Sequence, residues 1–264
     1  AIPFTPVRGP RLLIASSADQ SEIQEILIAG LKTLVTQNAL SSAHVLFPEN
    51  RELEELQKQG FMLRDSVQFH WHNQGYQDFE QFLQALTMKR RKNIRRERAS
   101  VASKPMTYRH VPGTIATADD WAFFYRCYEN TYIEHHSSPY LTEECIQMLG
   151  TSMPENLHLI IAYLNEIAIA SSLLVVDQLN SKAYGRYWGA IEHIPCLHFE
   201  LAYYQAIEYC IKEGIAIFEG GAQGEHKMAR GFLPTTLQSA HWIADPGFAG
   251  AVKRFLEREH EGMA

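Results

Sequence analysis

The stretch FEGGAQGEHKMARGF, residues 218–232, brings together side chains that can move protons and hold anions. Glu225 and His226 are titratable groups whose pKa values a protein can tune towards neutral pH, as general base catalysis requires. Lys227 is a cation that can hold a phosphate or a developing oxyanion. The preceding glycines permit positive φ and a close backbone approach to a ligand. The pattern predicts a catalytic loop, and the alternative is a glycine-rich turn that caps a helix.

Further candidates for this site follow from the two apolar runs that come before it. The runs 183–190 and 215–219 read as strands joined by a crossover helix, so we expect them to be parallel neighbours. In open sheets, ligands bind at the carboxyl ends of parallel strands. The expected substrate-binding residues are Arg186, Tyr187, Trp188, His198, Glu200, Glu219, Gly221, Gln223, Gly224 and Arg230. For the two aromatic residues strand packing is the alternative, and for His198 and Glu200 it is an ordinary helix start.

Four residues near this site belong to types that bind metals: His193, His198, Glu200 and His226. Their spacing matches no standard ligand pattern. We therefore expect no metal, and no tightly held cofactor follows from the residues.

Residues 89–98, KRRKNIRRER, form a strongly basic segment. The segment holds seven bases and one acid, a local charge of +6, whereas the chain has a net charge of −6, so the other residues sum to −12. Such a concentration favours an anionic partner, such as a phosphate, RNA or membrane headgroups. The predicted anion-binding residues are Lys89, Arg90, Arg91, Arg95 and Arg96. Bases in the last turns of a helix also suit its dipole, which is the alternative.

The composition is that of an ordinary globular protein. Of the 264 residues, 46% are hydrophobic and 20% are charged, enough to build one large domain or two small ones. No apolar run approaches the roughly 18 residues that a membrane helix needs. The four cysteines lack CxxC spacing and the N-terminus lacks the pattern of a signal peptide. We therefore expect reduced thiols and a cytoplasmic location.

Hydrophobic periodicity predicts the elements that position these residues. Helices are expected over 21–38, 50–59, from 78 through the basic segment, 117–134, 141–149, 198–213 and from about 248. Strands are expected over 43–47, 61–72, 157–163, 166–177, 183–190, 215–219 and 235–243. The expected caps of the first three helices are Ser21 with Gln24, Asn50, and Asp78 with Gln81.

Part of this pattern repeats at an offset of 171 residues. The dipeptides Gly60-Phe61 and His70-Trp71 are matched by Gly231-Phe232 and His241-Trp242. The same offset lays strand 43–47 near 215–218 and helix 21–38 over most of 198–213, so one unit of strands and helices occurs twice. Residues 50–59, NRELEELQKQ, then correspond to 221–230, GAQGEHKMAR. Because glycines and reactive groups replace a surface helix in the second copy, we expect that copy to carry the site.

The order of elements resembles the second half of the GNAT acyltransferase fold, and two such units joined by a basic helix resemble the Fem family of peptidoglycan-precursor aminoacyltransferases. The segments that carry the resemblance are PFTPVRGPRLL, MKRRKNIRRERA, GRYWGA, CLHFELAYYQAIEYCI and FEGGAQGEHKMARGFLP. They look most like a bacterial Fem-like group described as peptidoglycan biosynthesis or recognition proteins. Members of that group carry further residues upstream, so the resemblance implies a first unit truncated at its N-terminus.

The resemblance implies an α+β (α/β) fold of tandem GNAT-like units with mixed sheets flanked by helices. It divides the chain into 1–77, the C-terminal half of a first unit; 78–100, a basic connecting helix; and 101–264, a second unit that carries the site. An incomplete first sheet would leave an exposed edge near residues 4–14, through which the protein would self-associate.

The implied activity is transfer of an acyl or aminoacyl group onto an amine, with a peptidoglycan precursor as the acceptor. Aminoacyl-tRNA and acyl-CoA are the implied donors, which makes tRNA a candidate partner. Neither copy carries the Q/R-x-x-G-x-G/A loop with which acetyl-CoA enzymes of this fold hold pyrophosphate, and the second copy has IEHIP, residues 191–195, in its place. A CoA-dependent N-acetyltransferase is one alternative, and a non-catalytic module that recognises a peptidoglycan precursor is another.

Overall fold

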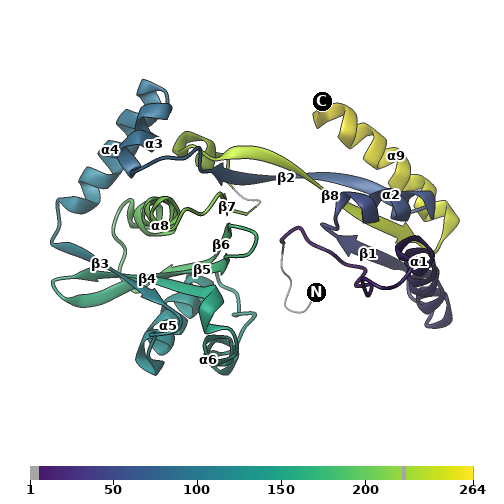
Figure 1. Ribbon diagram of the computed structural model, residues 1–264, viewed down its shortest axis with the longest axis horizontal. Coiled ribbons are helices and arrows are strands. Elements are labelled where there is room, and N and C mark those ends of the chain that lie inside the picture. Colours follow the sequence, from purple (N-terminus) through teal and green to yellow (C-terminus); the bar gives the residue numbers. More distant parts are fainter. Residues whose placement is uncertain (1–5, 222–223, 264) are drawn as a thin grey trace. The chain divides into compact units, whose positions relative to one another are not determined.

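The computed structural model describes residues 6–221 and 224–263, which form two compact units (Figure 1). Unit 1 holds the residues up to Gln68 together with those from Thr235 onward, and unit 2 spans Phe69–Pro234. The strands β2 (Met62–His72) and β8 (Leu233–Ile243) each contribute residues to both units. The expected mixed α+β class, with sheets flanked by helices, is confirmed. Among the described residues, no helix has the length and apolar character of a membrane span.

Unit 1 combines three described helices with a small sheet. Its elements are α1 (Gln20–Gln37), β1 (Ser42–Leu46), α2 (Asn50–Lys58), part of β2, part of β8, and α9 (Pro246–Met263). β1 pairs antiparallel with β8 in a register that sets Ser42 opposite Ile243. Its buried core consists of Ile28, Val45, Leu53, Leu56, Phe61 and Ala240.

Both helix caps expected in unit 1 were placed wrongly by a residue or two. α1 begins after Asp19, whose side chain accepts hydrogen bonds from the backbone N–H groups of Ser21 and Glu22. α2 begins after Glu49, not Asn50, because the side chain of Glu52 accepts from the N–H of Glu49 at 2.9 Å and completes a capping box. In each case a carboxylate just upstream satisfies the free N–H groups of the first turn.

The segment expected to form an exposed sheet edge, residues 4–14, lies partly outside the described residues. Within its described part, Gly9 donates to the carbonyl oxygen of Phe47 at 3.2 Å. The N–H groups of Arg11 and Leu12 donate to the Glu52 carboxylate at 2.7 and 2.6 Å. Self-association through this segment stays a prediction.

The sheet of unit 2 has the strand order β2-β7-β6-β5-β4-β3. Its strands are β3 (Met106–Pro112), β4 (Leu157–Leu164), β5 (Ile167–Asp177), β6 (Lys182–Ala190) and β7 (Ile217–Glu219). The strand pairings described in this unit are antiparallel, except that of β6 with β7, which is parallel as expected. β3 was not among the expected strands, because polar side chains interrupt its alternation.

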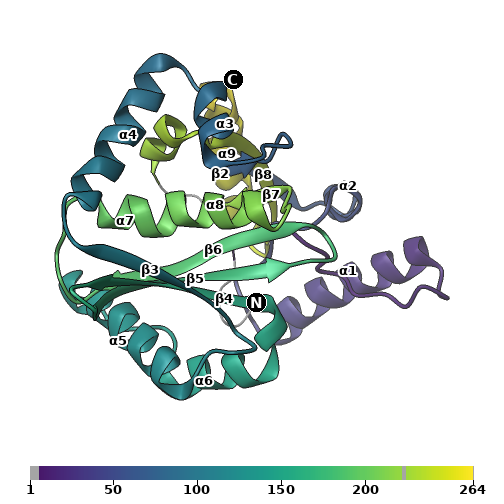
Figure 2. The same cartoon turned by 60° about the vertical axis from the view of Figure 1, so that its left-hand side comes forward.

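Helices cover both faces of this sheet (Figure 1, Figure 2). α5 (Ala118–Glu134) and α6 (Glu143–Ser152), followed by a short 3₁₀ turn (Pro154–Asn156), lie on one face. The crossover helix lies on the other and consists of α7 (Leu197–Phe199), a π-helical segment (Glu200–Tyr204) and α8 (Gln205–Lys212). An uninterrupted helix over 198–213 was expected, and the π-helical segment departs from it.

The basic segment does not continue the helix that begins after Asp78, contrary to expectation. α3 (Phe79–Ala85) ends at Leu86, which has an extended backbone, and α4 (Met88–Ala102) starts anew after Thr87. The Thr87 side chain caps α4 by accepting from the N–H of Arg90. The bases therefore begin in the first turn of a helix, where the dipole disfavours cations. The dipole explanation of the basic segment is wrong.

The repeat is reflected in the strand pairings. β2 and β8 are 171 residues apart, and each pairs with the short strand of the opposite copy: β8 with β1, and β2 with β7. The final strand of each copy thus lies beside the short strand of the other. The boundaries at residues 77 and 101 come from the sequence, whereas units 1 and 2 are defined by contacts in space. The boundaries at residues 77 and 101 stay a prediction.

Candidate active site

The candidate site lies in unit 2, where two parallel strands separate. Among the described residues, the pairing of β6 with β7 runs through Lys182–Tyr184 and Ile217–Glu219, and β6 continues beyond it to Ala190. Beyond β7 the chain turns away at Gly220, whose N–H donates to the carbonyl oxygen of Phe69 at 2.9 Å. A Cβ on Gly220 would come within 2.8 Å of the Phe232 ring, so glycine is required for this close approach.

A small cavity of about 140 Å³ occupies the place where the strands separate. Four of the expected residues line it together: Arg186, Tyr187, Trp188 and His198. The apolar part of its wall comes from Leu173, Leu174, Ala202 and Phe218. Tyr203 also lines it and was not singled out in the sequence, where it is one of many aromatic residues in an amphipathic helix.

The aromatic side of the cavity is tightly packed. The rings of Trp188 and His198 lie 4.5 Å apart, and the ring of Tyr203 lies 5.4 Å from that of His198. Burial lowers the pKa of His198 to about 4, with the nearby His226, Arg230 and Lys227 acting in the same direction. His198 is therefore neutral at pH 7 and serves as a polarisable wall, not as a cation.

Arg186 is held against its neighbour in the chain. Its Nη2 atom donates to the Tyr187 hydroxyl at 3.2 Å, and its guanidinium carbon lies 4.8 Å from the centre of that ring. The Tyr187 ring in turn packs edge-on against Tyr128 of α5 at 4.8 Å. The Tyr187 ring therefore packs on one side and borders the cavity on another, and its role in substrate binding stays a prediction.

The glycine loop is described only in part. Gly221 and Gly224 have φ of +80° and +98°, the left-handed region that glycine tolerates best. Gln223 and the side chain of Glu225 lie outside the described part of the chain. Glu225–Arg230 forms a 3₁₀ turn.

Lys227 is the most unusual group in the loop. Its side chain is 5% exposed, and its ammonium donates to the carbonyl oxygens of Gly220 at 2.5 Å and Gly221 at 3.4 Å. Burial lowers its pKa to about 8. The ammonium therefore holds the chain at the point where β7 ends, and it does not line the cavity.

His226 lies at the border of the site. Its imidazole is exposed, and its Nε2 atom lies 3.3 Å from the Tyr203 hydroxyl oxygen. Partial burial lowers its pKa, helped by the positive charges of Arg230 and Lys227 and opposed by Glu97. A neutral imidazole therefore contacts a phenol that itself borders the cavity.

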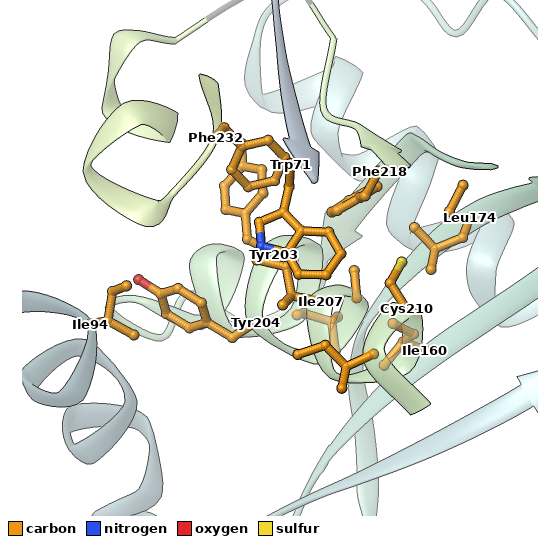
Figure 3. Close-up of a cluster of buried hydrophobic side chains, with 14 of the residues drawn as sticks. Trp71, Ile94, Ile160, Leu174, Tyr203, Tyr204, Ile207, Cys210, Phe218 and Phe232 are labelled. Atoms are coloured by element: carbon orange, nitrogen blue, oxygen red, sulfur yellow. The ribbon is translucent and has the colours of Figure 1, made fainter. Parts of the chain in front are cut away.

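Arg230 is committed to the structure of the unit rather than to a ligand. Its Nη2 atom donates to the Glu97 carboxylate of α4 at 2.7 Å, and its Nη1 atom to the carbonyl oxygen of His226 at 2.7 Å. Glu97 also accepts from the hydroxyl of Tyr204 and from Asn93. Figure 3 shows Tyr204 extending towards Ile94 of α4, the helix that also carries Glu97. This buried network ties the loop after Gly224 to α4.

Two expected carboxylates also lie away from the cavity. Glu200 is 2% exposed and receives hydrogen bonds from Arg98 at 2.9 and 3.1 Å and from Gln205 at 2.9 Å. Glu219 is buried beside Lys182, at 3.5 Å, and His70, at 3.8 Å. Both carboxylates are therefore engaged within the unit.

The basic face of α4 is largely on the surface. Lys89, Lys92, Arg95 and Arg96 are exposed, whereas Arg90 and Arg91 are half-buried. Arg95 pairs with Glu80 and Arg96 contacts Asn93. Among the described residues, Lys89, Arg90 and Lys92 form no ion pair with an acidic residue.

A larger cavity of about 990 Å³ in unit 2 is lined by residues 73–80 and 208–216. Two of its carboxylates, Glu80 and Glu208, are already paired with Arg95 and Arg98. Among the described residues of its wall there is no histidine and no arginine, so we assign the site to the smaller cavity. Within the described residues, no group of three or more His, Cys, Asp and Glu is placed to hold a metal ion.

Comparisons with known proteins identify the fold. The FemAB-like family model, described as peptidoglycan biosynthesis/recognition, matches residues 1–264. L-PGS from Bacillus licheniformis has a similar structure, with a TM-score of 0.59 and 9% identity over 88% of this chain and 78% of its own. FemX gives 0.57 and 10% over 89% and 80%.

A tandem GNAT protein from the clavulanic acid biosynthesis pathway is also similar, with a TM-score of 0.51 and 12% identity over 89% of this chain and 74% of its own. No protein with a curated description matches the chain. Likenesses at these identities concern the fold, and they confirm the expected tandem GNAT-like architecture.

Proposed function

We propose that this chain, which belongs to the FemAB-like family, transfers an acyl or aminoacyl group onto an amine. The observation that carries the proposal is the cavity between the separating strands β6 and β7, with Arg186 at its wall and the Tyr203–His226 pair at its border. Ligands in open sheets bind at such carboxyl ends of parallel strands.

The chemistry of acyl transfer matches the groups around the cavity. The apolar wall of Leu173, Leu174 and Phe218 excludes water from an acyl group. Arg186 offers a fixed guanidinium for a phosphate or carboxylate of the donor or acceptor. His226 is a neutral base near the cavity, and it accepts the proton that the attacking amine must lose. Lys227 positions the backbone of Gly220 and Gly221.

We also propose the chemical classes of the donor and of the acceptor. The family description supports a peptidoglycan precursor as the acceptor. Aminoacyl-tRNA and acyl-CoA remain the two donor classes, and the absence of the pyrophosphate loop from the sequence favours the first. A cytoplasmic location agrees with either donor and stays a prediction.

The bases on the surface of α4 support an anionic partner. Lys89, Arg90 and Lys92 pair with no acidic residue in the described part of the chain, whereas Arg98 of the same helix pairs with Glu200 and Glu208. We assign the binding of RNA or a phosphate-bearing substrate to Lys89, Arg90 and Lys92. Binding that does not weaken as salt concentration rises would contradict this assignment.

The test of the transfer site compares two cavities. Ala202→Leu fills the small cavity with a larger side chain, and Ala216→Leu makes the same change at the border of the larger one. We expect kcat/KM for transfer from aminoacyl-tRNA or acetyl-CoA to fall about 10²-fold in Ala202→Leu, because displaced reactants lose their alignment. Ala216→Leu should stay within about twofold of the wild type, since nothing near the reacting groups moves.

Two outcomes would contradict the proposal. Full activity of Ala202→Leu, or a loss confined to Ala216→Leu, would place the chemistry elsewhere. A wild-type protein that binds a peptidoglycan precursor but shows no turnover with either donor would be a recognition module.

A further inference from the structure

Tyr203 is the group through which the cavity reaches a proton acceptor. It is 6% exposed and lines the cavity, whereas its partner His226 is exposed and is not part of the cavity wall. The two are joined by the 3.3 Å contact between the phenol oxygen and Nε2. The Tyr203 hydroxyl therefore lies between the cavity and His226, on the path of a proton that moves from one to the other.

The other hydroxyls that line the cavity are engaged elsewhere. Ser172 donates to the carbonyl oxygen of Leu201 at 3.4 Å, and the Tyr187 oxygen accepts from Arg186 at 3.2 Å. A tyrosine hydroxyl can donate one hydrogen bond and accept another at the same time. Tyr203 alone, among the described hydroxyls of the wall, is bonded to a titratable base.

The π-helical segment explains why Tyr203 faces this way. The N–H of Gln205 donates to the carbonyl oxygen of Glu200, five residues earlier, which widens the turn. Within that turn, Tyr204 bonds to Glu97 of α4 while Tyr203 bonds to His226 of the 3₁₀ turn. Such π turns occur frequently at functional sites.

We propose that Tyr203 relays a proton between an amine bound in the cavity and His226. The inference rests on the proposed transferase function. The neutral amine attacks the acyl carbon of an ester or thioester and forms the N–C bond. The nitrogen's proton passes to the Tyr203 oxygen as that oxygen's own proton passes to Nε2 of His226. When the C–O or C–S bond breaks, the proton returns along the same path to the departing oxygen or sulfur.

Partial burial and the nearby positive charges favour the unprotonated imidazole of His226, which is the form that can accept a proton. Lys227 and Arg230 of its own 3₁₀ turn disfavour the imidazolium, Glu97 of α4 favours it, and His198 of the crossover helix is neutral. Burial raises the pKa of Tyr203 to about 12. The phenol therefore exchanges one proton for another and does not become a phenolate, as a relay requires.

The test removes one oxygen atom. Tyr203→Phe keeps the ring and its contacts. Tyr209→Phe makes the same change on α8, where the hydroxyl forms no hydrogen bond with a described residue. We expect kcat to fall about 10²-fold in Tyr203→Phe, in the range of general acid–base effects, with KM within about twofold. Tyr209→Phe should match the wild type in both constants.

A second readout does not depend on turnover. In the wild type the phenol donates to neutral Nε2 and stabilises the uncharged imidazole, so NMR titration of Tyr203→Phe should show a raised pKa for His226. The same spectra report whether the variant is folded.

The outcomes separate the relay from the transferase function. An active wild type whose Tyr203→Phe variant keeps its kcat would overturn the relay alone. An unchanged pKa of His226 in that variant would also overturn it, because the hydrogen bond would not exist in solution. A wild type without turnover would overturn the proposed function and the relay with it.

Discussion

Residues 50–59 and 221–230 stand at the same place in the two copies of the repeat but are built in different ways. The first stretch is a surface helix whose first turn is closed by Glu49 and Glu52, and whose Leu53 and Leu56 enter the core of unit 1. The second is a glycine turn followed by a 3₁₀ turn. At the offset of 171, Leu56 corresponds to Lys227, so a core leucine has been exchanged for a buried cation.

This exchange shows where the second copy departs from ordinary packing. Among the described residues, the buried Lys227 ammonium donates to carbonyl oxygens alone, and Nε of Arg230 is buried without a hydrogen-bond partner. Buried polar groups of this kind cost free energy unless they are fully satisfied. Departures from consistent packing are expected at functional sites, and Lys227 and Arg230 both lie in the turn beside the cavity.

The largest difference between the two stretches should come from their ion pairs. Arg230→Met leaves the Glu97 carboxylate buried without its partner, so we expect the free energy of unfolding to fall by about 3–5 kcal/mol. Lys58→Met removes a pair with Glu55 in which the lysine is 70% exposed, and it should cost less than about 1 kcal/mol. Urea denaturation of the two variants measures both values.

A double variant sharpens this comparison. Adding Glu97→Gln to Arg230→Met removes the unpaired charge, so part of the lost stability should return. If Arg230→Met and Lys58→Met cost the same, the two stretches would not differ in the way we describe.

The repeat and the parallel pairing of β6 with β7 were inferred from patterns that the sequence carries directly. Gly-Phe and His-Trp recur at one offset, and a glycine run ends an apolar strand. Such local signals are sufficient to predict that Arg186, Tyr187 and Trp188 lie near the glycine loop. The break between α3 and α4 was missed because Leu86-Thr87 contains neither glycine nor proline, and only a threonine cap marks it.

The contacts of charged groups between distant segments were not predictable in the same way. Glu200 was expected at the site, but Arg98, 102 residues earlier, binds it in the fold. Arg230 meets Glu97 across 133 residues. No local periodicity encodes these pairs, and the π-helical segment that aims Tyr203 at His226 has no established sequence signal. The charged and aromatic residues of the sequence identify candidates for the site. Only the fold shows which of these residues already contact other residues of the protein.

Stability against pH offers a second test of the exchange of Leu56 for Lys227. The pKa of Lys227 is lowered from 10.5 to about 8 by burial. Between these values the folded protein has released the proton while the unfolded chain still binds it, so stability rises with pH through that window. The free energy of unfolding of the wild type, relative to Lys227→Met, should increase by about 3 kcal/mol from pH 8 to 10.5.

Leu56→Met is the matched control, because it places the same side chain at the corresponding position of the first copy. Its stability relative to the wild type should stay constant over that pH range, since no titratable group is removed. A constant difference for Lys227→Met as well would mean that its ammonium keeps its proton in the folded state.

The smallest expected effect comes from the two glycines that end these stretches, Gly60 and Gly231. Both have positive φ, +84° and +88°, so alanine at either position is strained by about 1 kcal/mol. At Gly60 a Cβ meets nothing closer than Nζ of Lys32 at 4.0 Å, whereas at Gly231 it would come within 2.8 Å of the Phe82 ring. Overpacking adds about 1–3 kcal/mol, so Gly231→Ala should cost more than Gly60→Ala by that amount in urea denaturation. Equal losses of stability in the two variants would show that the Phe82 ring moves aside freely. Its packing against Gly231 would then not constrain the turn of the second copy.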